Sequence, residues 1–270
     1  MNIKIIIQVC FKGLYQFFTN KHFRRFLQLL FRFGNVNQRY QEKKVTVNSL
    51  TLTIPDGLSF AWQYYEIFYK QYYRFTTSKD APRIIDCGAN VGLSCLYYLK
   101  DYPKAKITAF EASPYIAEFL KTNLETNGAQ NVETIIAAVW THNNGLKLNE
   151  DKSDNSAISE TGGIDVPSIS LKEYLEKENE VDFLKMDIEG AEIDVIKEIK
   201  DQLHKIDRFF IEYHSYISGK QELSVILHIL EESGFRYHLE NARNQSAPFE
   251  GVKRTSDMDL QINIFAWRNP

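Results

Sequence analysis

Cysteine is scarce in this chain of 270 residues, which contains only Cys10, Cys87 and Cys95. The number is odd, and no two of these residues form a C-x-x-C pair. The sequence therefore indicates neither a disulfide framework nor a thiolate zinc site. A reducing compartment, the cytoplasm, is the expected location of such a protein.

Acidic residues are absent from the first 41 positions, which hold seven Lys or Arg. All 35 acidic residues lie in the remainder, together with 25 basic ones, so the body of the chain carries a net charge of about −10. Nucleic-acid binding normally requires a basic face on the protein. The acidic body therefore argues against nucleic acid as the substrate.

The sequence also lacks an apolar run that would span a membrane. Residues 3–18 are apolar around a wide arc, but Lys12 interrupts them, and no small-residue cleavage site follows to support a signal peptide. From about Lys21 to Phe33 the spacing predicts a basic amphipathic helix. Two interpretations stay open for residues 1–35: peripheral contact with the inner face of a membrane, or a helical cap or dimer surface.

The order of patterns along the chain predicts three parts. Residues 1–42 form the basic amphipathic helical extension, and residues 43–80 form a hairpin and an aromatic helix that lead into the core. The hairpin is expected to turn at Asn48-Ser49, and the helix to cover residues 60–75. Residues 81–270 form the main domain.

Residues 83–92, RIIDCGANVG, are typical of a buried strand that breaks into a glycine turn and opens a helix. A dinucleotide fingerprint, G-x-G-x-x-G, needs a middle glycine so that the pyrophosphate can approach the helix N-terminus. Position 90 is Asn instead. The pattern suits a ligand that has no phosphate at this point, such as S-adenosylmethionine.

Two further strands add to the expected cofactor site. The strand at 106–110 ends at Glu111, whose carboxylate could accept hydrogen bonds from both ribose hydroxyls. A strand at 131–139 ends in small apolar residues, which suit an adenine ring and equally suit ordinary packing. The residues expected at the cofactor are Asp86, Gly88, Ala89, Asn90, Gly92, Glu111, Ala112 and Ala138.

A third block sharpens the interpretation, because an apolar strand at 181–186 leads into Asp187-Ile188-Glu189-Gly190-Ala191-Glu192, and Glu212-Tyr213-His214 follow later. Together with residues 86–92 and Phe110-Glu111, these motifs resemble the FkbM family of methyltransferases. The resemblance covers roughly residues 45–215. It implies a class I S-adenosylmethionine-dependent O-methyltransferase acting on a small molecule or a glycan, for example in polysaccharide biosynthesis.

The alternation of strands and helices predicts an α/β fold: a doubly wound, Rossmann-like, seven-stranded sheet with an antiparallel last strand, plus the N-terminal helical and hairpin extension. Further strands are expected at 164–169, 208–213, 235–239 and 260–267. Polar segments at 142–163 and 241–258 are predicted to be loops. The first is expected to form a hairpin with a mobile tip and to act as a lid.

Acids at the strand ends are the candidate catalytic groups. Asp187 is the first candidate for taking the proton of the acceptor hydroxyl, and His214, just past the strand at 208–213, is the second because its pKa lies nearest neutrality. Glu189 is expected to orient the acceptor. Glu192 orients the acceptor or Glu189, or simply meets the helix dipole. A rival mechanism uses a divalent metal bound by Asp187, Glu212 and also His214.

Two function classes remain as alternatives to methyl transfer. An NAD(P)-dependent Rossmann oxidoreductase would share the fold but needs the missing middle glycine. A non-catalytic membrane-bound binding module would explain the basic N-terminal helices but not the acids at the strand ends.

Overall fold

The computed structural model describes residues 12–149, 157–158, 162–242 and 258–268. The described residues form two compact units, one of residues 12–76 and one of the described residues from 77 onward. The finer sequence division at residues 42 and 80 stays a prediction. Much of the expected lid and of the loop at 241–258 lies outside the described residues.

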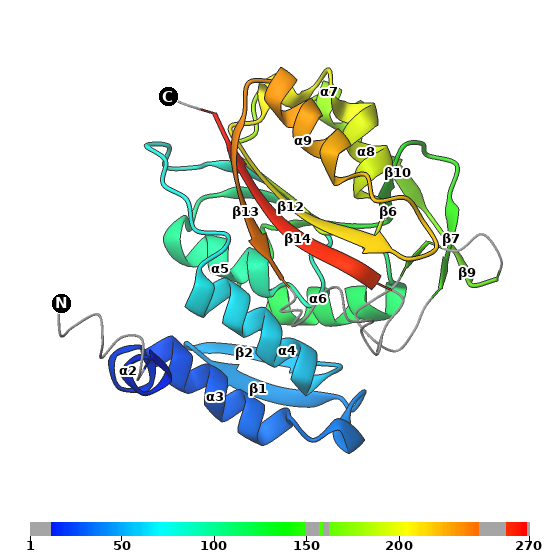
Figure 1. Cartoon of the computed structure of the whole chain (residues 1–270). Helices are drawn as coiled ribbons and strands as arrows, with labels where there is room; N and C mark the ends of the chain where they lie inside the picture. Colours follow the sequence, from blue (N-terminus) through cyan, green and yellow to red (C-terminus); the bar gives the residue numbers. More distant parts are fainter. Residues whose placement is uncertain (1–11, 150–156, 159–161, 243–257, 269–270) are drawn as a thin grey trace. The chain divides into compact units, whose positions relative to one another are not determined.

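The first unit contains two N-terminal helices, followed by a hairpin and then by an aromatic helix (Figure 1). Its elements are α2 (Lys12–Thr19), α3 (Lys21–Phe33), the short helix η1 (Val36–Gln38), β1 (Lys43–Val47), β2 (Leu50–Ile54), α4 (Gly57–Tyr64) and the π-helix η2 (Tyr65–Lys70). The predicted helix at 21–33 is confirmed. Among the helices that the structure describes, none is both long and apolar enough to cross a membrane.

Local backbone chemistry explains the hairpin and the limits of the aromatic helix. The predicted turn is confirmed, because Asn48 and Ser49 both adopt left-handed conformations, with φ of 49° and 70°. The prediction of a helix over 60–75 is wrong at both ends. The Asp56 side chain caps the helix three residues earlier, at Gly57. Gln71, with φ of 57°, ends it after Lys70.

The second unit contains the predicted seven-stranded sheet, in the order β13-β14-β12-β11-β3-β4-β5 (Figure 1). Its strands are β3 (Arg83–Cys87), β4 (Lys106–Glu111), β5 (Glu133–Ile136), β11 (Phe183–Met186), β12 (Arg208–Tyr216), β13 (Arg236–Asn241) and β14 (Met258–Trp267). The last strand runs antiparallel to both β12 and β13, as predicted. The other neighbouring pairs are parallel, which confirms the doubly wound α/β fold.

Helices cover both faces of this sheet. The helices α7 (Leu171–Glu176), α8 (Glu192–Ile199) and α9 (Leu223–Glu232) lie on one face, and α5 (Leu93–Asp101) and α6 (Pro114–Thr126) lie on the other (Figure 1). A short helix, η3 (Leu203–Lys205), precedes β12. The core on the first face packs apolar side chains of the central strands against α8, with Leu184, Ile211 and Ile196 fully buried.

Two strands predicted as continuous are each split in the structure. The stretch 131–139 divides into β5 and β6 (Ala138–Trp140), and 164–169 divides into β9 (Ile164–Val166) and β10 (Ser168–Ser170). The second break is at Pro167, which cannot donate to a ladder. Its carbonyl oxygen accepts a hydrogen bond from Ala138 N at 2.9 Å, so β6 pairs with β10 outside the main sheet. Strand β9 instead pairs with β7 (Leu146–Asn149), which also pairs with β8 (Ala157–Ile158).

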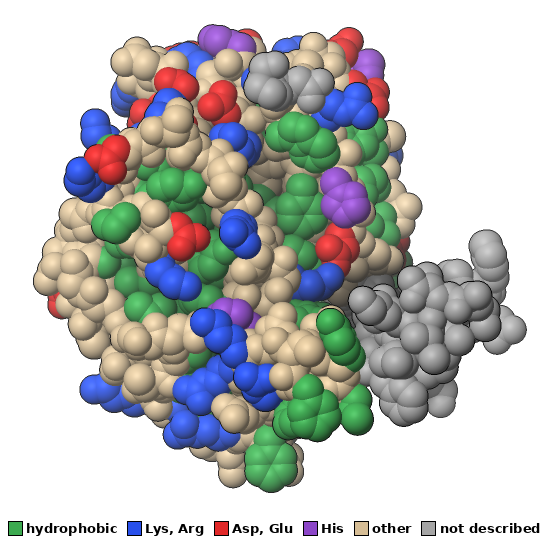
Figure 2. Space-filling view, turned by 90° about the vertical axis from the view of Figure 1, so that its left-hand side faces the viewer, with side chains coloured by type: hydrophobic (Ala, Val, Ile, Leu, Met, Phe, Trp, Pro, Cys, Tyr) green, Lys and Arg blue, Asp and Glu red, His purple; other side chains and the backbone are tan. Residues whose placement is uncertain are grey.

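The face of the molecule in Figure 2 shows how the side chains of the first unit are distributed. In its lower part, where α2 and α3 lie, Lys and Arg side chains gather beside hydrophobic side chains that protrude from the surface.

Candidate functional site

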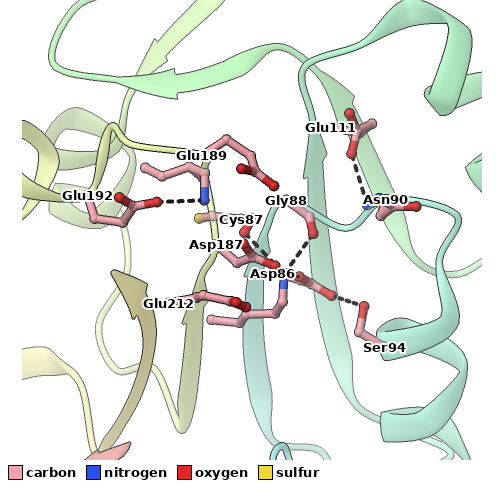
Figure 3. A network of polar contacts seen from close by, with 12 residues as sticks. Asp86, Cys87, Gly88, Asn90, Ser94, Glu111, Asp187, Glu189, Glu192 and Glu212 are labelled. Carbon is pink, nitrogen blue, oxygen red and sulfur yellow. Dashed lines mark hydrogen bonds and ion pairs between the residues drawn. The ribbon is translucent and has the colours of Figure 1, made fainter. Parts of the chain in front are cut away.

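The register of the parallel strands brings four predicted site residues to one level at the carboxyl edge of the sheet (Figure 3). In order across the sheet they are Glu111, Gly88, Asp187 and Glu212. From β3 the chain proceeds to β4 and β5 on one side, and later to β11 and β12 on the other. The edge above β3 and β11 is therefore the topological switch point, where open α/β sheets bind ligands.

The glycines of the turn after β3 are required by close packing. Gly88 has φ of 87°, and a Cβ there would lie 2.0 Å from the carbonyl oxygen of Asp187. Gly92 has φ of 85°, and a Cβ there would lie 2.8 Å from Cδ1 of Leu120 on α6. Gly88 thus allows the turn to lie against the end of β11, and Gly92 serves the packing of two helices.

All five amides of the turn at residues 88–92 already donate hydrogen bonds within the protein. Their acceptors are the carbonyl oxygen of Phe110 for Gly88 (3.0 Å) and Ala89 (2.9 Å), Glu111 for Asn90 (2.9 Å), the Asn90 side chain for Val91 (2.7 Å) and the Ala89 carbonyl for Gly92 (2.9 Å). Phosphate binding by such a turn depends on amides that point at the ligand. None of these five amides is therefore left to point at a phosphate.

Glu111 closes the other side of the turn. Its Oε2 accepts from Asn90 N and its Oε1 from Ser113 N, both at 2.9 Å. Burial raises the pKa of Glu111 to about 7, although the two amide hydrogen bonds act in the opposite direction. A carboxylate oxygen has two lone pairs, so each oxygen can still accept from one further hydroxyl. This arrangement fits the predicted contact with a ribose, which stays a prediction.

Small apolar side chains lie next to Glu111. Ala112 packs against a cluster that contains Ala138, Leu148 and Val166. Ala138, predicted for the adenine wall, and Ala112, predicted to bind the cofactor, therefore belong to one apolar group, although β6 lies outside the main sheet. Ala89 is buried and contributes its amide to the turn.

Asp86 contributes indirectly, because its side chain has no exposed surface. Its Oδ2 accepts from Ser94 Oγ at 2.5 Å, and its Oδ1 lies 3.4 Å from Lys185 Nζ. The structure thus shows this carboxylate in contact with Lys185 and with Ser94 on α5, and its predicted contact with the cofactor stays a prediction.

Lys185 is the residue of the site that the sequence interpretation missed. Its Nζ donates to the carbonyl oxygen of Gly88 at 2.7 Å and lies 3.3 Å from Asp187 Oδ2. Burial alone lowers the pKa of Lys185, but Asp187 and Asp86 outweigh it and raise the pKa above its usual value. The available signal was a lysine in the apolar strand at 181–186, between acids that the fold brings to one edge.

Strained backbone marks both loops of the site. In the described part of the second unit, Asn90 (φ 49°) and Glu189 (φ 54°) are the non-glycine residues with positive φ. A left-handed conformation costs such a residue about 1–2 kcal/mol. Retained strain of this kind clusters at functional sites. Both residues lie at the carboxyl edge of the sheet, in the loops that follow β3 and β11.

Glu192, the first residue of α8, organises the loop after β11. Its fully buried Oε1 accepts from the amides of Ile188 (3.2 Å) and Gly190 (3.1 Å) and lies 3.0 Å from His214 Nδ1. The second interpretation of Glu192, an acid that simply meets the helix dipole, is therefore too limited. This carboxylate fixes the loop that carries Glu189 and orients the imidazole.

The prediction that His214 lies past its strand is wrong, because β12 continues to Tyr216. The extension is stabilised by the antiparallel partner β14, in which Gln261 pairs with His214. Side chains two residues apart on a strand share a face, so Glu212 and His214 both reach the site. Gln261 also donates a hydrogen bond to Glu212.

Three carboxylates surround the His214 ring. Besides Glu192 at Nδ1, Oε2 of Glu189 lies 3.8 Å and Oε1 of Glu212 lies 3.9 Å from Nε2. Burial alone lowers the pKa of His214, but these carboxylates outweigh it and hold the pKa well above its usual value. The carboxylates therefore favour the protonated form of His214, and its role as a base stays a prediction.

The neighbouring glutamates are shifted as well. Burial raises the pKa of Glu189 to about 8 and that of Glu212 to about 7, and His214 opposes both shifts. Asp187 raises both values further. The cluster therefore binds protons near neutral pH, and its most exposed carboxylates are Asp187 and Glu189, at 25% and 22%.

The predicted metal ligands Asp187, Glu212 and His214 do come together, with one ligand atom of each lying within 4.8 Å of the others. Oxygen and imidazole ligands suit several divalent ions. The geometry thus permits a metal at this position, which stays a prediction.

Comparisons with known proteins point to one family. Residues 86–237 match the family described as Methyltransferase FkbM domain. Methyltransferase 1 of Beauveria bassiana (strain ARSEF 2860) is 27% identical and aligns over 65% of this chain and 80% of its own length. Methyltransferase sdnD of Sordaria araneosa is 28% identical, over 66% and 77%. The solved SAM-dependent methyltransferase from Agrobacterium tumefaciens resembles this chain in fold, with a TM-score of 0.51 at 10% identity, covering 84% of this chain and 70% of that one.

Proposed function

Because this chain belongs to the FkbM family of methyltransferases, we propose that it transfers the methyl group of S-adenosylmethionine to a hydroxyl group of a sugar, within a glycan or glycoconjugate. The observation that carries the proposal is the group of Asp187, Glu189, Glu212 and His214 beside the glycine turn. The oxidoreductase alternative has no support, since the matched proteins are methyltransferases and the turn amides are occupied.

The family implies S-adenosylmethionine as the methyl donor, and the residues at the edge of the sheet fit it. The turn at 88–92 and Glu111 would hold its ribose and amino-acid portions, and Ala112 and Ala138 would contact the adenine. When bound, this cofactor supplies an electrophilic methyl group on a positively charged sulfur. The acidic edge around Asp187 is electrostatically suited to such a cation.

Asp187 is proposed to position the acceptor hydroxyl and to take its proton. It follows β11 directly and keeps a quarter of its side chain exposed, and its backbone amide donates to the carbonyl oxygen of Cys87 at 3.1 Å. Proton transfer requires the base to lie within hydrogen-bond reach of the hydroxyl. His214 is a weaker candidate for the base, because it must first lose the proton that its neighbours stabilise.

A sugar suits this site because the partly exposed carboxylates accept hydrogen bonds. Asp187 and Glu189 offer acceptor oxygens, and a sugar supplies several hydroxyl donors at fixed spacing. A polyanionic acceptor would meet repulsion from the same groups. We therefore infer a neutral acceptor with several hydroxyls rather than nucleic acid.

Mass spectrometry of candidate glycans incubated with the protein and isotope-labelled S-adenosylmethionine tests this function. An alkali-stable methyl ether on a sugar oxygen is the expected product. Asp187→Asn should abolish its formation while cofactor binding persists, and Asp194→Asn, on the exposed side of α8, is the matched control. Label on nitrogen, or in an alkali-labile ester, would contradict the assignment of a hydroxyl acceptor.

A further inference from the structure

The first unit carries an aromatic and basic surface that the proposed enzyme reaction does not use. It consists of Leu14, Phe17 and Phe18 on α2 and Lys21, Phe31 and Arg32 on α3, and we call it the α2–α3 surface. Phe18 is 71% exposed and Phe31 is 95% exposed. In the lower part of Figure 2, basic and hydrophobic side chains are neighbours where these helices lie. Bulky aromatic side chains that remain in water beside basic groups are typical of an interaction surface.

The packing of α3 within its unit does not account for this surface. The helix already buries an apolar face through Phe26, Leu29 and Phe33. Phe31 projects from the side opposite to this buried face, and Lys21 and Arg32 are exposed on the flank between the two. The interpretation of this segment as a helical cap therefore applies to one face of α3 and leaves the other without a function.

Specific hydrogen bonds fix α2 next to the basic face of α3. Asn20 caps α3 by accepting from the amides of His22 (2.9 Å) and Phe23 (3.1 Å). Arg24 donates to the carbonyl oxygens of Phe17 (2.9 Å) and Phe18 (3.0 Å) in the last turn of α2. These bonds hold the aromatic residues of α2 beside the cationic side chains.

Phe31 lies on the same side of α3 as Arg24, the residue that contacts the end of α2. It is seven residues, two helical turns, after Arg24, so the two side chains project from the same face of the helix. The aromatic residues of both helices are therefore presented together with the basic ones.

We propose that the α2–α3 surface binds the anionic face of a phospholipid membrane. Charge complementarity supports this partner, because residues 1–41 contain seven Lys or Arg and no acid. An anionic lipid surface attracts such residues by about 1 kcal/mol each, and aromatic side chains insert at the headgroup level. The proposed contact is with the membrane surface, through side chains of α2 and α3.

A second copy of the chain is a poorer partner for this surface. A two-fold dimer would place the same basic face of each copy against the other, and like charges across an interface oppose association. The membrane proposal does not depend on the proposed methyl transfer, because it concerns only residues of the first unit.

Vesicle co-sedimentation of the full chain tests the proposal. We expect binding to vesicles of phosphatidylcholine with phosphatidylserine, little binding to pure phosphatidylcholine, and weakening as salt is raised. The double variants K21E/R32E and F18S/F31S should each lower the partition coefficient at least ~10-fold, as expected for the loss of more than ~1.4 kcal/mol of contact energy. Thermal unfolding of each variant verifies that it is folded.

Matched variants on the second unit serve as controls. Lys121→Glu on α6 and Leu239→Ser on β13 change an exposed charge and an exposed apolar side chain without touching the α2–α3 surface. Both should bind the vesicles as the parent does. Equal binding to pure phosphatidylcholine, or unchanged binding of both double variants, would overturn the proposal. So would sedimentation velocity showing self-association that the same variants abolish, since that result assigns the surface to a second copy.

Discussion

Replacing Gly88 by alanine tests how closely the glycine turn at residues 88–92 packs against the end of β11. The loss of stability has two sources, the left-handed backbone conformation and the clash of the added Cβ. The left-handed φ of 87° costs an alanine about 1–2 kcal/mol. The added Cβ would also lie 2.0 Å from the carbonyl oxygen of Asp187, so β3 and β11 must move apart locally. Overpacking of this kind costs a further ~1–3 kcal/mol. The displacement would also weaken the 2.7 Å bond from Lys185 to the Gly88 carbonyl, a charged hydrogen bond worth about 1.5–3 kcal/mol.

Gly128→Ala is the matched control, because Gly128 has φ of 72° and nothing within 4 Å of a Cβ. Its free energy of unfolding should fall only by the conformational cost of about 1–2 kcal/mol. For a domain of this size 1 kcal/mol corresponds to roughly 2–4 °C in Tm, so Gly128→Ala should lower Tm by about 2–8 °C.

In Gly88→Ala the free energy of unfolding should fall by ~4 kcal/mol or more in total, which lowers Tm by about 8 °C at least. This variant should also lose cofactor binding. Differential scanning calorimetry of both variants measures these shifts. Equal falls in Tm for the two variants would refute the close approach of the turn to Asp187.

Three other perturbations test the remaining contacts of the site. Lys185→Met should cost about 3–5 kcal/mol in urea unfolding, because it leaves the buried carboxylate of Asp86 without its ion-pair partner; a loss below 1 kcal/mol would show that the pair contributes little. Glu192→Gln should lower the pKa of His214, which NMR of the imidazole protons can follow. Because the pKa of His214 is raised in the folded protein, the stability it contributes is lost as pH rises through that value, and this loss should move to lower pH in the variant; an unchanged titration would contradict the contact at Nδ1. Exhaustive chelation should leave turnover unchanged, and restoration of lost activity by Mg²⁺ or Mn²⁺ would instead favour a metal held by Asp187 and its neighbours.

Local patterns were enough to predict the sheet and the positions of the glycine turn and Glu111 at its carboxyl edge. The glycine turn and Glu111 lie at strand ends that short sequence patterns identify, and the topology of a doubly wound sheet then places them together. Long-range pairing decided the rest. His214 lies within β12 because β14, far along the chain, extends the ladder to Tyr216. The break at Pro167 sends β6 and β10 into a separate sheet.

The shifted pKa values of the site could not be predicted from local sequence patterns either. Sequence alone gives His214 its ordinary pKa, and only the folded structure shows that Glu189, Glu192 and Glu212 surround the ring. Lys185 escaped notice for the same reason, because its partners Asp86 and Asp187 are recognisable as such only once β3 and β11 lie side by side.

Isothermal titration calorimetry with S-adenosylmethionine, S-adenosylhomocysteine and NADH tests the cofactor site most directly when it is repeated on Glu111→Gln. Both sulfur compounds should bind the parent protein and NADH should not. The amide side chain should weaken S-adenosylmethionine binding by ~10–100-fold, as expected for the loss of one charged hydrogen bond, while Glu118→Gln on the exposed side of α6 should bind normally. Binding of NADH, or equal affinity of the parent and Glu111→Gln for S-adenosylmethionine, would contradict a methyl-donor site between the glycine turn and Glu111.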